Sequence, residues 1–303
     1  EEHGWAPPED STGIAHIMEH SVLCGSRKYT SKEPFVELLK GSLQTFLNAF
    51  TYPDRTCYPV ASQNLKDYHN LINVYLDAVL HPRALNDPQV LQQEGWHYEL
   101  EDLSEEMKYK GVVYNEMKGV YSSPEALAQR HASRILFPNS VYSHDYGGDP
   151  PSIPDLSFES FQRFHNTYYH PSNARVFFYG DDDEESRLNL LSEYLDEYEE
   201  SNMTCENRSS NIEYQPKLKL PKSRHRFPYP TNDASGKHIV TTNWLLNHER
   251  LSEKESLALV VLDHLLLATT SSPLYKRLIE SRIGESVTGG GLSDELLQST
   301  FSV

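Results

Sequence analysis

The motif His16-x-x-Glu19-His20 limits what this chain can be more than any other stretch of it. In a helix, His16 and His20 lie one above the other on the same side, and Glu19 lies beside them. Two neutral imidazoles at this spacing can bind Zn²⁺, and the order of the residues is the inverted form of the zinc protease helix, in which the carboxylate activates a water molecule. The motif therefore predicts a metal site with Glu19 as its general base.

Chance is the alternative explanation, because a chain with 14 histidines and 44 acidic residues would contain this string about one time in twenty. The placement of the motif favours the metal site. Ser11 or Thr12 can cap a helix that begins here, and Gly25 suits the left-handed residue that ends one. His16 and His20 fall on the row of this helix that should face the core, where an unpaired polar ring is costly.

A third ligand is expected on a second helix, over residues 110–121. Glu116 falls there at helical spacing between Val113 and Val120, inside an apolar stripe. Burying an unpaired carboxylate costs free energy that a metal ion would remove, so Glu116 is the best candidate. Alternatively, its side chain reaches solvent at the edge of the stripe. Glu94 and Glu99 are weaker candidates, because the apolar period around them is poorer.

Length and charge narrow the classes of partner. The 303 residues, 38% of them hydrophobic, suffice for one large or two medium domains. We expect no membrane association, because no run of 18 apolar residues exists. The net charge of −17 argues against nucleic acid, whose phosphates would be repelled, and favours basic partners.

The hydrophobic periodicity predicts an α+β chain, with an antiparallel-rich mixed sheet packed against helices. Strands are expected over residues 43–52 and 56–60 as a hairpin, and over 174–179 and 236–246. Helices are expected from about 11 to 25 and over residues 34–40, 64–80, 87–93, 110–121, 123–137, 157–170 and 181–200.

The end of the chain resembles its beginning. When His264 is aligned with His20, an acidic residue, Asp263, again precedes the histidine. Val260 stands at the position of His16, so the second copy lacks the metal-binding pair. We therefore predict a duplicated unit with one metal site. The alternative is an accidental match between two pairs of amphipathic helices that are each joined by a Ser/Pro loop.

This repeat divides the chain into three predicted parts. Residues 1–200 form a zinc-binding catalytic domain that lacks its first strand or strands. The polar, proline-containing residues 201–235 form a linker, and 236–303 begin a second, metal-less repeat domain. The first unit is thus nearly complete. The second is truncated, and we expect the chain to end before its hairpin closes.

Three stretches, residues 16–26, 47–56 and 111–119, resemble the presequence protease branch of the pitrilysin and insulin-degrading-enzyme superfamily. The resemblance implies a duplicated pitrilysin-type unit and a zinc metalloendopeptidase that degrades short unfolded peptides, such as cleaved organellar targeting presequences. It implies one Zn²⁺ per chain, bound by His16, His20 and Glu116, with Glu19 as the general base. The alternative is a non-catalytic or inactive truncated relative with a structural or peptide-binding role.

The resemblance also implies how substrate binds. A segment like Asn48, Ala49, Phe50 and Thr51 offers its edge to an extended peptide, although Phe50 is equally suited to the core. The partners would be unfolded basic peptides in the mitochondrial matrix or the chloroplast stroma, or both. Members of the family are about three times this length and close two halves around a chamber, so the remainder of a full-length protein is expected to complete the site.

Overall fold

The computed structural model describes residues 6–32, 34–198, 212–218, 223–231, 238–288 and 290–303. They form two compact units. The first comprises the described parts of 1–120 and 144–211, and the second those of 121–143 and 212–303. None of the helices in the described ranges is long and apolar enough to cross a membrane.

Unit 1 is mainly helical, and its helices follow the predicted order. They are α1 (Ile14–Val22), α2 (Pro34–Gly41), α3 (Leu65–Leu80), α4 (Pro88–Glu94), α5 (Val112–Val120), α7 (Phe158–Tyr168) and α8 (Glu184–Leu195). Its strands pair antiparallel, β1 (Gln44–Leu47) with β4 (Val60–Ser62), β2 (Phe50–Thr51) with β3 (Thr56–Cys57), and β5 (His97–Glu99) with β6 (Lys108–Lys110). The predicted hairpin over 43–60 is therefore confirmed, with a break between β1 and β2.

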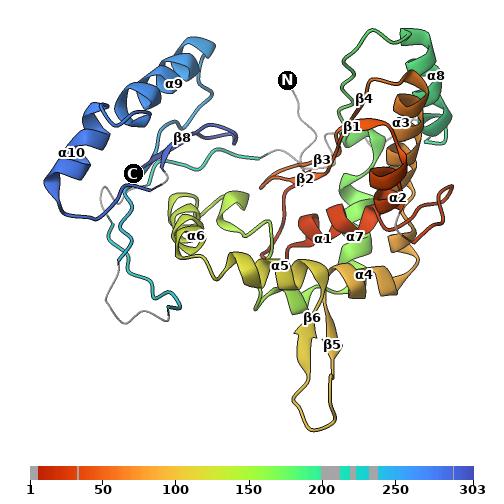
Figure 1. Ribbon diagram of the computed structural model, residues 1–303, viewed down its shortest axis with the longest axis horizontal. Helices are drawn as coiled ribbons and strands as arrows, with labels where there is room; N and C mark the ends of the chain where they lie inside the picture. Colours follow the sequence, from red (N-terminus) through yellow and green to blue (C-terminus); the bar gives the residue numbers. More distant parts are fainter. Residues whose placement is uncertain (1–5, 33, 199–211, 219–222, 232–237, 289) are drawn as a thin grey trace. The chain divides into compact units, whose positions relative to one another are not determined.

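The helix that carries the histidine motif, α1, lies in the core of unit 1. It contacts α4, α7 and β2, and its side chains Ile17, Met18 and Val22 are fully buried (Figure 1). These residues share one face at helical spacing, which leaves the histidines on a neighbouring face. Burial of the apolar face holds α1, and with it the motif, in a fixed position.

Polar side chains cap four other helices of this unit at their N-termini. Asn64, Asp87, Ser157 and Asp183 each accept a hydrogen bond from a first-turn amide, of α3, α4, α7 and α8 respectively. These contacts satisfy amides that have no partner inside the helix. The starts of α3, α4 and α7 agree with the predicted ranges, whereas α8 begins three residues later than expected, at Glu184.

The predicted cap of α1 by Ser11 or Thr12 is wrong. The capping position is Gly13, in the left-handed conformation with φ 72°, and no side chain caps the helix. The Oγ of Ser11 instead accepts a hydrogen bond from the backbone N–H of Asp145. A Cβ on Gly13 would lie 2.8 Å from the carbonyl oxygen of Gly147, so only glycine fits this close approach. Packing of a distant loop replaces the local cap.

The predicted buried strand over 174–179 is also wrong. No strand forms there, and the side chains of Phe177 and Tyr179 are 86% and 90% exposed. An apolar run becomes a strand only when a neighbouring strand supplies hydrogen-bond partners, and none in the described part of the chain does so. The helix expected over 181–200 is shorter, and residues 199–200 lie outside the described ranges.

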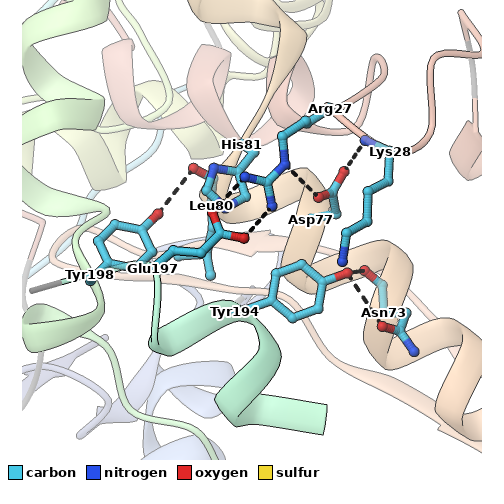
Figure 2. Close-up of polar contacts among 9 residues, drawn as sticks. All are labelled: Arg27, Lys28, Asn73, Asp77, Leu80, His81, Tyr194, Glu197 and Tyr198. Carbon is cyan, nitrogen blue, oxygen red and sulfur yellow. Dashed lines mark hydrogen bonds and ion pairs between the residues drawn. The ribbon is translucent and has the colours of Figure 1, made fainter.

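A polar cluster joins the loop after α1 to α3 and α8 (Figure 2). Arg27 donates two hydrogen bonds to Glu197, and the backbone N–H of Lys28 donates to the fully buried Asp77 at 2.7 Å. The hydroxyl of Tyr194 donates to a backbone carbonyl of α3 at 3.0 Å. A buried carboxylate is tolerated when hydrogen bonds and a cation compensate for its lost hydration. The cluster therefore fixes the chain just beyond α1, the helix that carries the histidine motif.

Unit 2 has a small antiparallel sheet and three helices in its described residues. Its elements are α6 (Pro124–Leu136), β7 (Asn243–Leu245), α9 (Glu253–Leu267), α10 (Pro273–Ser281), β8 (Gly291–Ser293) and β9 (Thr300–Ser302), with the strand order β7-β9-β8. The expectation that the chain ends before this hairpin closes is wrong, because β8 pairs with β9 in full register. The residues between β8 and β9 reverse the direction of the chain. The sequence pattern did not indicate this turn.

The predicted linker falls largely outside the described residues, which omit 199–211, 219–222 and 232–237. Its described part includes Gln215, which is fully buried. The side-chain oxygen of Gln215 accepts a hydrogen bond from the backbone N–H of Asn139, and its backbone carbonyl accepts one from the side chain of Gln298. This part of the segment is therefore packed inside unit 2.

Candidate metal centre

Three side chains from two helices of unit 1 converge. His16 and His20 on α1 and Glu116 on α5 each offer one ligand atom, and these atoms lie within 4.8 Å of one another. The Nε2 atom of His16 lies 3.7 Å from one carboxylate oxygen of Glu116, and the Nε2 atom of His20 lies 3.8 Å from the other. Tetrahedral ligands at about 2.1 Å from a Zn²⁺ ion are about 3.4 Å apart, so the cluster has the dimensions and the donor atoms of a zinc site.

Hydrogen bonds on the far side of each ring orient the histidines. The Nδ1 atom of His16 lies 3.0 Å from the carbonyl oxygen of Gly147, and the Nδ1 atom of His20 lies 3.4 Å from a carboxylate oxygen of Glu94. Both partners only accept, so each Nδ1 carries the proton when the ring is neutral. Both Nε2 lone pairs are then available toward Glu116, as metal coordination requires.

Glu94 contributes to this arrangement without being one of the three converging ligands. It is buried on α4 and also accepts hydrogen bonds from the side chains of Gln93, at 2.8 Å, and Cys24. Burial acts to raise the pKa of Glu94, but the hydrogen bonds from His20, Gln93 and Cys24 hold it below its ordinary value. Burial acts to lower the pKa of His20. Its carboxylate neighbours, Glu94 foremost, nevertheless hold this pKa above its ordinary value.

From the sequence, Glu94 was only a weaker candidate for the third metal ligand, and its contact with His20 was not predicted. A signal existed, because Val90, Leu91 and Glu94 are buried on one face of α4 at helical spacing. Glu99 lies elsewhere, on β5, where it pairs with Lys110 at 2.9 Å.

Glu116 meets the histidines, but not through burial. Val113 and Met117 on the same helix are buried, whereas the side chain of Glu116 is 49% exposed. The expectation that a desolvated carboxylate needs a metal partner is therefore wrong for this residue. It lies at the edge of the apolar stripe, open to solvent, and its approach to both imidazoles makes it a candidate ligand.

Glu19 lies beside the converging ligands and outside their set. One of its carboxylate oxygens accepts a hydrogen bond from the hydroxyl of Thr51 on β2. This bond links the motif helix to the segment predicted to bind substrate, and it leaves the second carboxylate oxygen free to act as a proton acceptor.

The segment from Asn48 to Thr51 lies partly in β2. The carbonyl oxygen of Asn48 accepts a hydrogen bond from the hydroxyl of Tyr75, and Phe50 pairs with Cys57 on β3. The side chain of Phe50 is 38% exposed, so it does not belong to the core. Strand β2 has one partner strand in the described residues, which leaves its other edge unpaired there.

The corresponding positions of unit 2 gather no metal-binding cluster among the described residues. The carboxylate of Asp263 on α9 instead accepts a hydrogen bond from the backbone N–H of Leu292 on β8. In unit 1, Glu19 also accepts a hydrogen bond from a strand, but the donor is a side chain, the hydroxyl of Thr51 on β2. The polar contact between helix and strand is repeated, whereas the histidine pair is not.

Comparisons with known proteins match both units. Residues 6–135 match the family model described as insulinase (peptidase family M16), and residues 155–303 match the one described as the peptidase M16 inactive domain. Presequence protease 1, chloroplastic/mitochondrial, of Arabidopsis thaliana is 58% identical over 300 residues, which cover 98% of this chain and 27% of that protein. The chain spans 27–30% of the length of the first curated relatives that it matches.

Solved structures share the fold at low sequence identity. A protease from Helicobacter pylori superposes with a TM-score of 0.62 at 18% identity, over 100% of this chain and 65% of that one. Pitrilysin superposes with a TM-score of 0.56 at 14% identity, over 98% of this chain and 29% of that one.

Proposed function

Because the chain belongs to the insulinase family of peptidases, peptidase family M16, we propose that it is the zinc-binding part of a metalloendopeptidase. The substrates are short unfolded peptides, such as targeting presequences cleaved from organellar proteins, and the location is the mitochondrial matrix, the chloroplast stroma or both. The observation that carries the proposal is the convergence of His16, His20 and Glu116. The name of the Arabidopsis relative, a presequence protease, supports the substrate class and the location.

His16, His20 and Glu116 would hold one Zn²⁺ ion per chain. The fit rests on their nitrogen and oxygen donors, on their separations and on the orientation of both rings by partners at Nδ1. A bound Zn²⁺ ion supplies a Lewis acid that acidifies a water molecule and polarises the peptide carbonyl.

Glu19 would be the general base. Its free carboxylate oxygen accepts the proton of the attacking water and then delivers it to the nitrogen of the leaving amine. The hydroxyl of Thr51 holds the other oxygen of Glu19, which keeps the carboxylate in one orientation during both transfers.

Substrate would bind along the free edge of β2. Backbone hydrogen bonds from Asn48, Ala49, Phe50 and Thr51 to an extended peptide demand little of its sequence, which suits a peptidase of many unfolded substrates. The net charge of −17 favours basic peptides. Because the relatives are much longer than this chain, we propose that further polypeptide encloses the peptide and excludes water from the site.

The test compares the chain with its Glu19→Gln variant on an unstructured basic peptide of about 25 residues, with zinc measured in both. We expect equal zinc content and a loss of at least about 100-fold in kcat/KM, because the glutamine amide cannot accept the proton. Glu159→Gln, an exposed change on α7, is the matched control and should retain full activity.

Retained activity in Glu19→Gln with normal zinc would remove Glu19 from the mechanism. A parent chain that binds zinc and peptide but never hydrolyses it would instead favour the alternative, a non-catalytic relative with a peptide-binding or structural role.

A further inference from the structure

The hairpin formed by β5 and β6, residues 97–110, extends away from α4 and α5 of unit 1 (Figure 1). Tyr98 and Tyr109 pair across its two strands, and their rings lie 5.1 Å apart. Trp96 at the base contacts both rings and donates a hydrogen bond to the carbonyl oxygen of Leu156. Aromatic pairs therefore stabilise the ribbon at its base, while its tip makes no contribution to the core.

Apolar side chains at the tip are exposed. Leu103 is 94% exposed, Met107 66% and Leu100 44%. Removing apolar side chains from water is favourable, but the fold leaves these three exposed, so they contribute no burial free energy to its stability. A group of apolar side chains on a projecting ribbon is typical of a surface that a partner covers.

The same tip is negatively charged. Residues 97–110 contain five carboxylates and two lysines. Lys108 pairs with Glu105 at 2.7 Å, and Lys110 pairs with Glu99 and Glu101. The carboxylates therefore exceed the cations that neutralise them. A partner that covers this tip should combine apolar side chains with positive charge, and anionic lipids and nucleic acids are disfavoured.

A cavity of about 520 Å³, open to solvent, lies at the base of the hairpin. Amide side chains from both flanking helices line it, among them Gln92 and Gln93 of α4 and Asn115 of α5. Side-chain amides both donate and accept hydrogen bonds, so they can pair with a peptide backbone of any sequence. Gln93 also donates to Glu94, the residue beside His20, which connects the cavity to the candidate metal centre.

We propose that the hairpin and this cavity form a second peptide-binding surface, separate from the edge of β2, for a basic amphipathic segment of the substrate. The inference rests on the proposed function in that the bound peptide is taken to be a substrate. Organellar targeting peptides have the required chemistry, because they are amphipathic, rich in arginine and poor in acidic residues. The apolar face would cover Leu103 and Met107, and the arginines would face the carboxylates.

The test measures binding of a labelled basic amphipathic peptide of about 25 residues by fluorescence anisotropy, in the Glu19→Gln background so that cleavage does not intervene. Leu103→Ser/Met107→Ser should raise Kd about ten- to a hundredfold, because two apolar contacts are lost. Leu188→Ser, a change on α8 at a residue that is 61% exposed, close to the exposure of Met107, is the control and should leave Kd unchanged. Both variants should unfold at the parent temperature, since none of these side chains is buried.

Charge is tested separately. Glu105→Gln/Glu106→Gln should weaken binding several-fold at low salt and reduce the dependence of Kd on salt. A peptide of the same apolar pattern with glutamate in place of arginine should bind poorly to the parent chain, as should one whose apolar residues are replaced by serine.

Unchanged Kd in both hairpin variants, or equal binding of the basic and acidic peptides, would overturn the proposal. If a hairpin variant changes the sedimentation of the chain but not its Kd for peptide, the occupant of the hairpin is a second copy of the chain. That result would also overturn the proposal. Failure of the proposed function gives a different result. The chain would then not hydrolyse peptides, but the hairpin variants would still weaken peptide binding.

Discussion

His16 and His20 are equivalent in the sequence motif but differ in their hydrogen-bond partners. His16 contacts a neutral carbonyl, whereas His20 contacts the carboxylate of Glu94. A carboxylate partner at Nδ1 increases the basicity of the opposite nitrogen and fixes the tautomer. We therefore infer that Glu94 is a positioning residue for His20, the proposed metal ligand.

Glu94→Gln should reduce zinc affinity about 10- to 100-fold, because an amide supplies no charge and can present its NH₂ group to Nδ1 of His20. Competition with a chromogenic chelator measures the affinity. Glu99→Gln, which changes the other rival glutamate on the exposed hairpin, is the control and should bind zinc as the parent does. Equal affinities in both variants would show that Glu94 has only a packing role.

At the scale of elements, α7 is attached to α3 through a buried histidine. The Nε2 atom of His165 lies 2.9 Å from the carbonyl oxygen of Val79 at the end of α3. Burial lowers the pKa of His165 to about 4 from its ordinary value of 6.5, although the hydrogen bond to Val79 acts to raise it. The ring therefore stays neutral in the folded protein down to about pH 4.

This depressed pKa predicts a loss of stability in acid. Between pH 6.5 and 4 the unfolded chain binds a proton at His165 that the folded chain does not, so the stabilisation is complete above pH 6.5 and is lost as the pH falls toward 4. The loss amounts to at most about 3 kcal/mol. Urea unfolding at several pH values measures it.

His165→Asn should flatten this part of the pH dependence, whereas His97→Gln, on the exposed hairpin, should not. A parent protein whose free energy of unfolding stays constant from pH 7 to pH 5 would contradict the assignment.

At the scale of the whole molecule, the fold is the predicted pitrilysin type, and the chain covers only part of such a protein. Each unit has a motif helix whose acidic residue contacts a strand, Glu19 with β2 and Asp263 with β8. Among the described residues, only unit 1 gathers three side chains that could hold a metal ion. The domain boundaries at 200 and 235 remain predictions.

The duplication predicts one zinc ion per chain, bound by unit 1. His20→Ala should reduce zinc content to less than about a tenth of the parent's, because the site loses one of three protein ligands. His264→Ala makes the same change at the aligned position of unit 2 and should leave zinc content unchanged. Elemental analysis of both purified variants decides this, and two zinc ions per parent chain would contradict it.

Features that depend on neighbours along the chain could be predicted from the amino-acid pattern. Local spacing predicts the histidine motif, the starts of α3, α4 and α7 and the hairpin of β1 to β4, because caps, turns and helical faces are formed by residues a few positions apart. The apolar stripe made Glu116 a candidate ligand, and the resemblance added the substrate-binding segment. The roles of both remain predictions.

Features that depend on partners far away in the sequence became known only from the three-dimensional structure. Gly13 replaces the expected cap because the loop at Gly147 packs against it, and residues 174–179 form no strand because no strand among the described residues lies beside them. Glu94 reaches His20 only because α4 lies beside α1. Such contacts join residues that are far apart in sequence, and each is decided by the three-dimensional packing that excludes water and satisfies backbone groups, which no local pattern encodes.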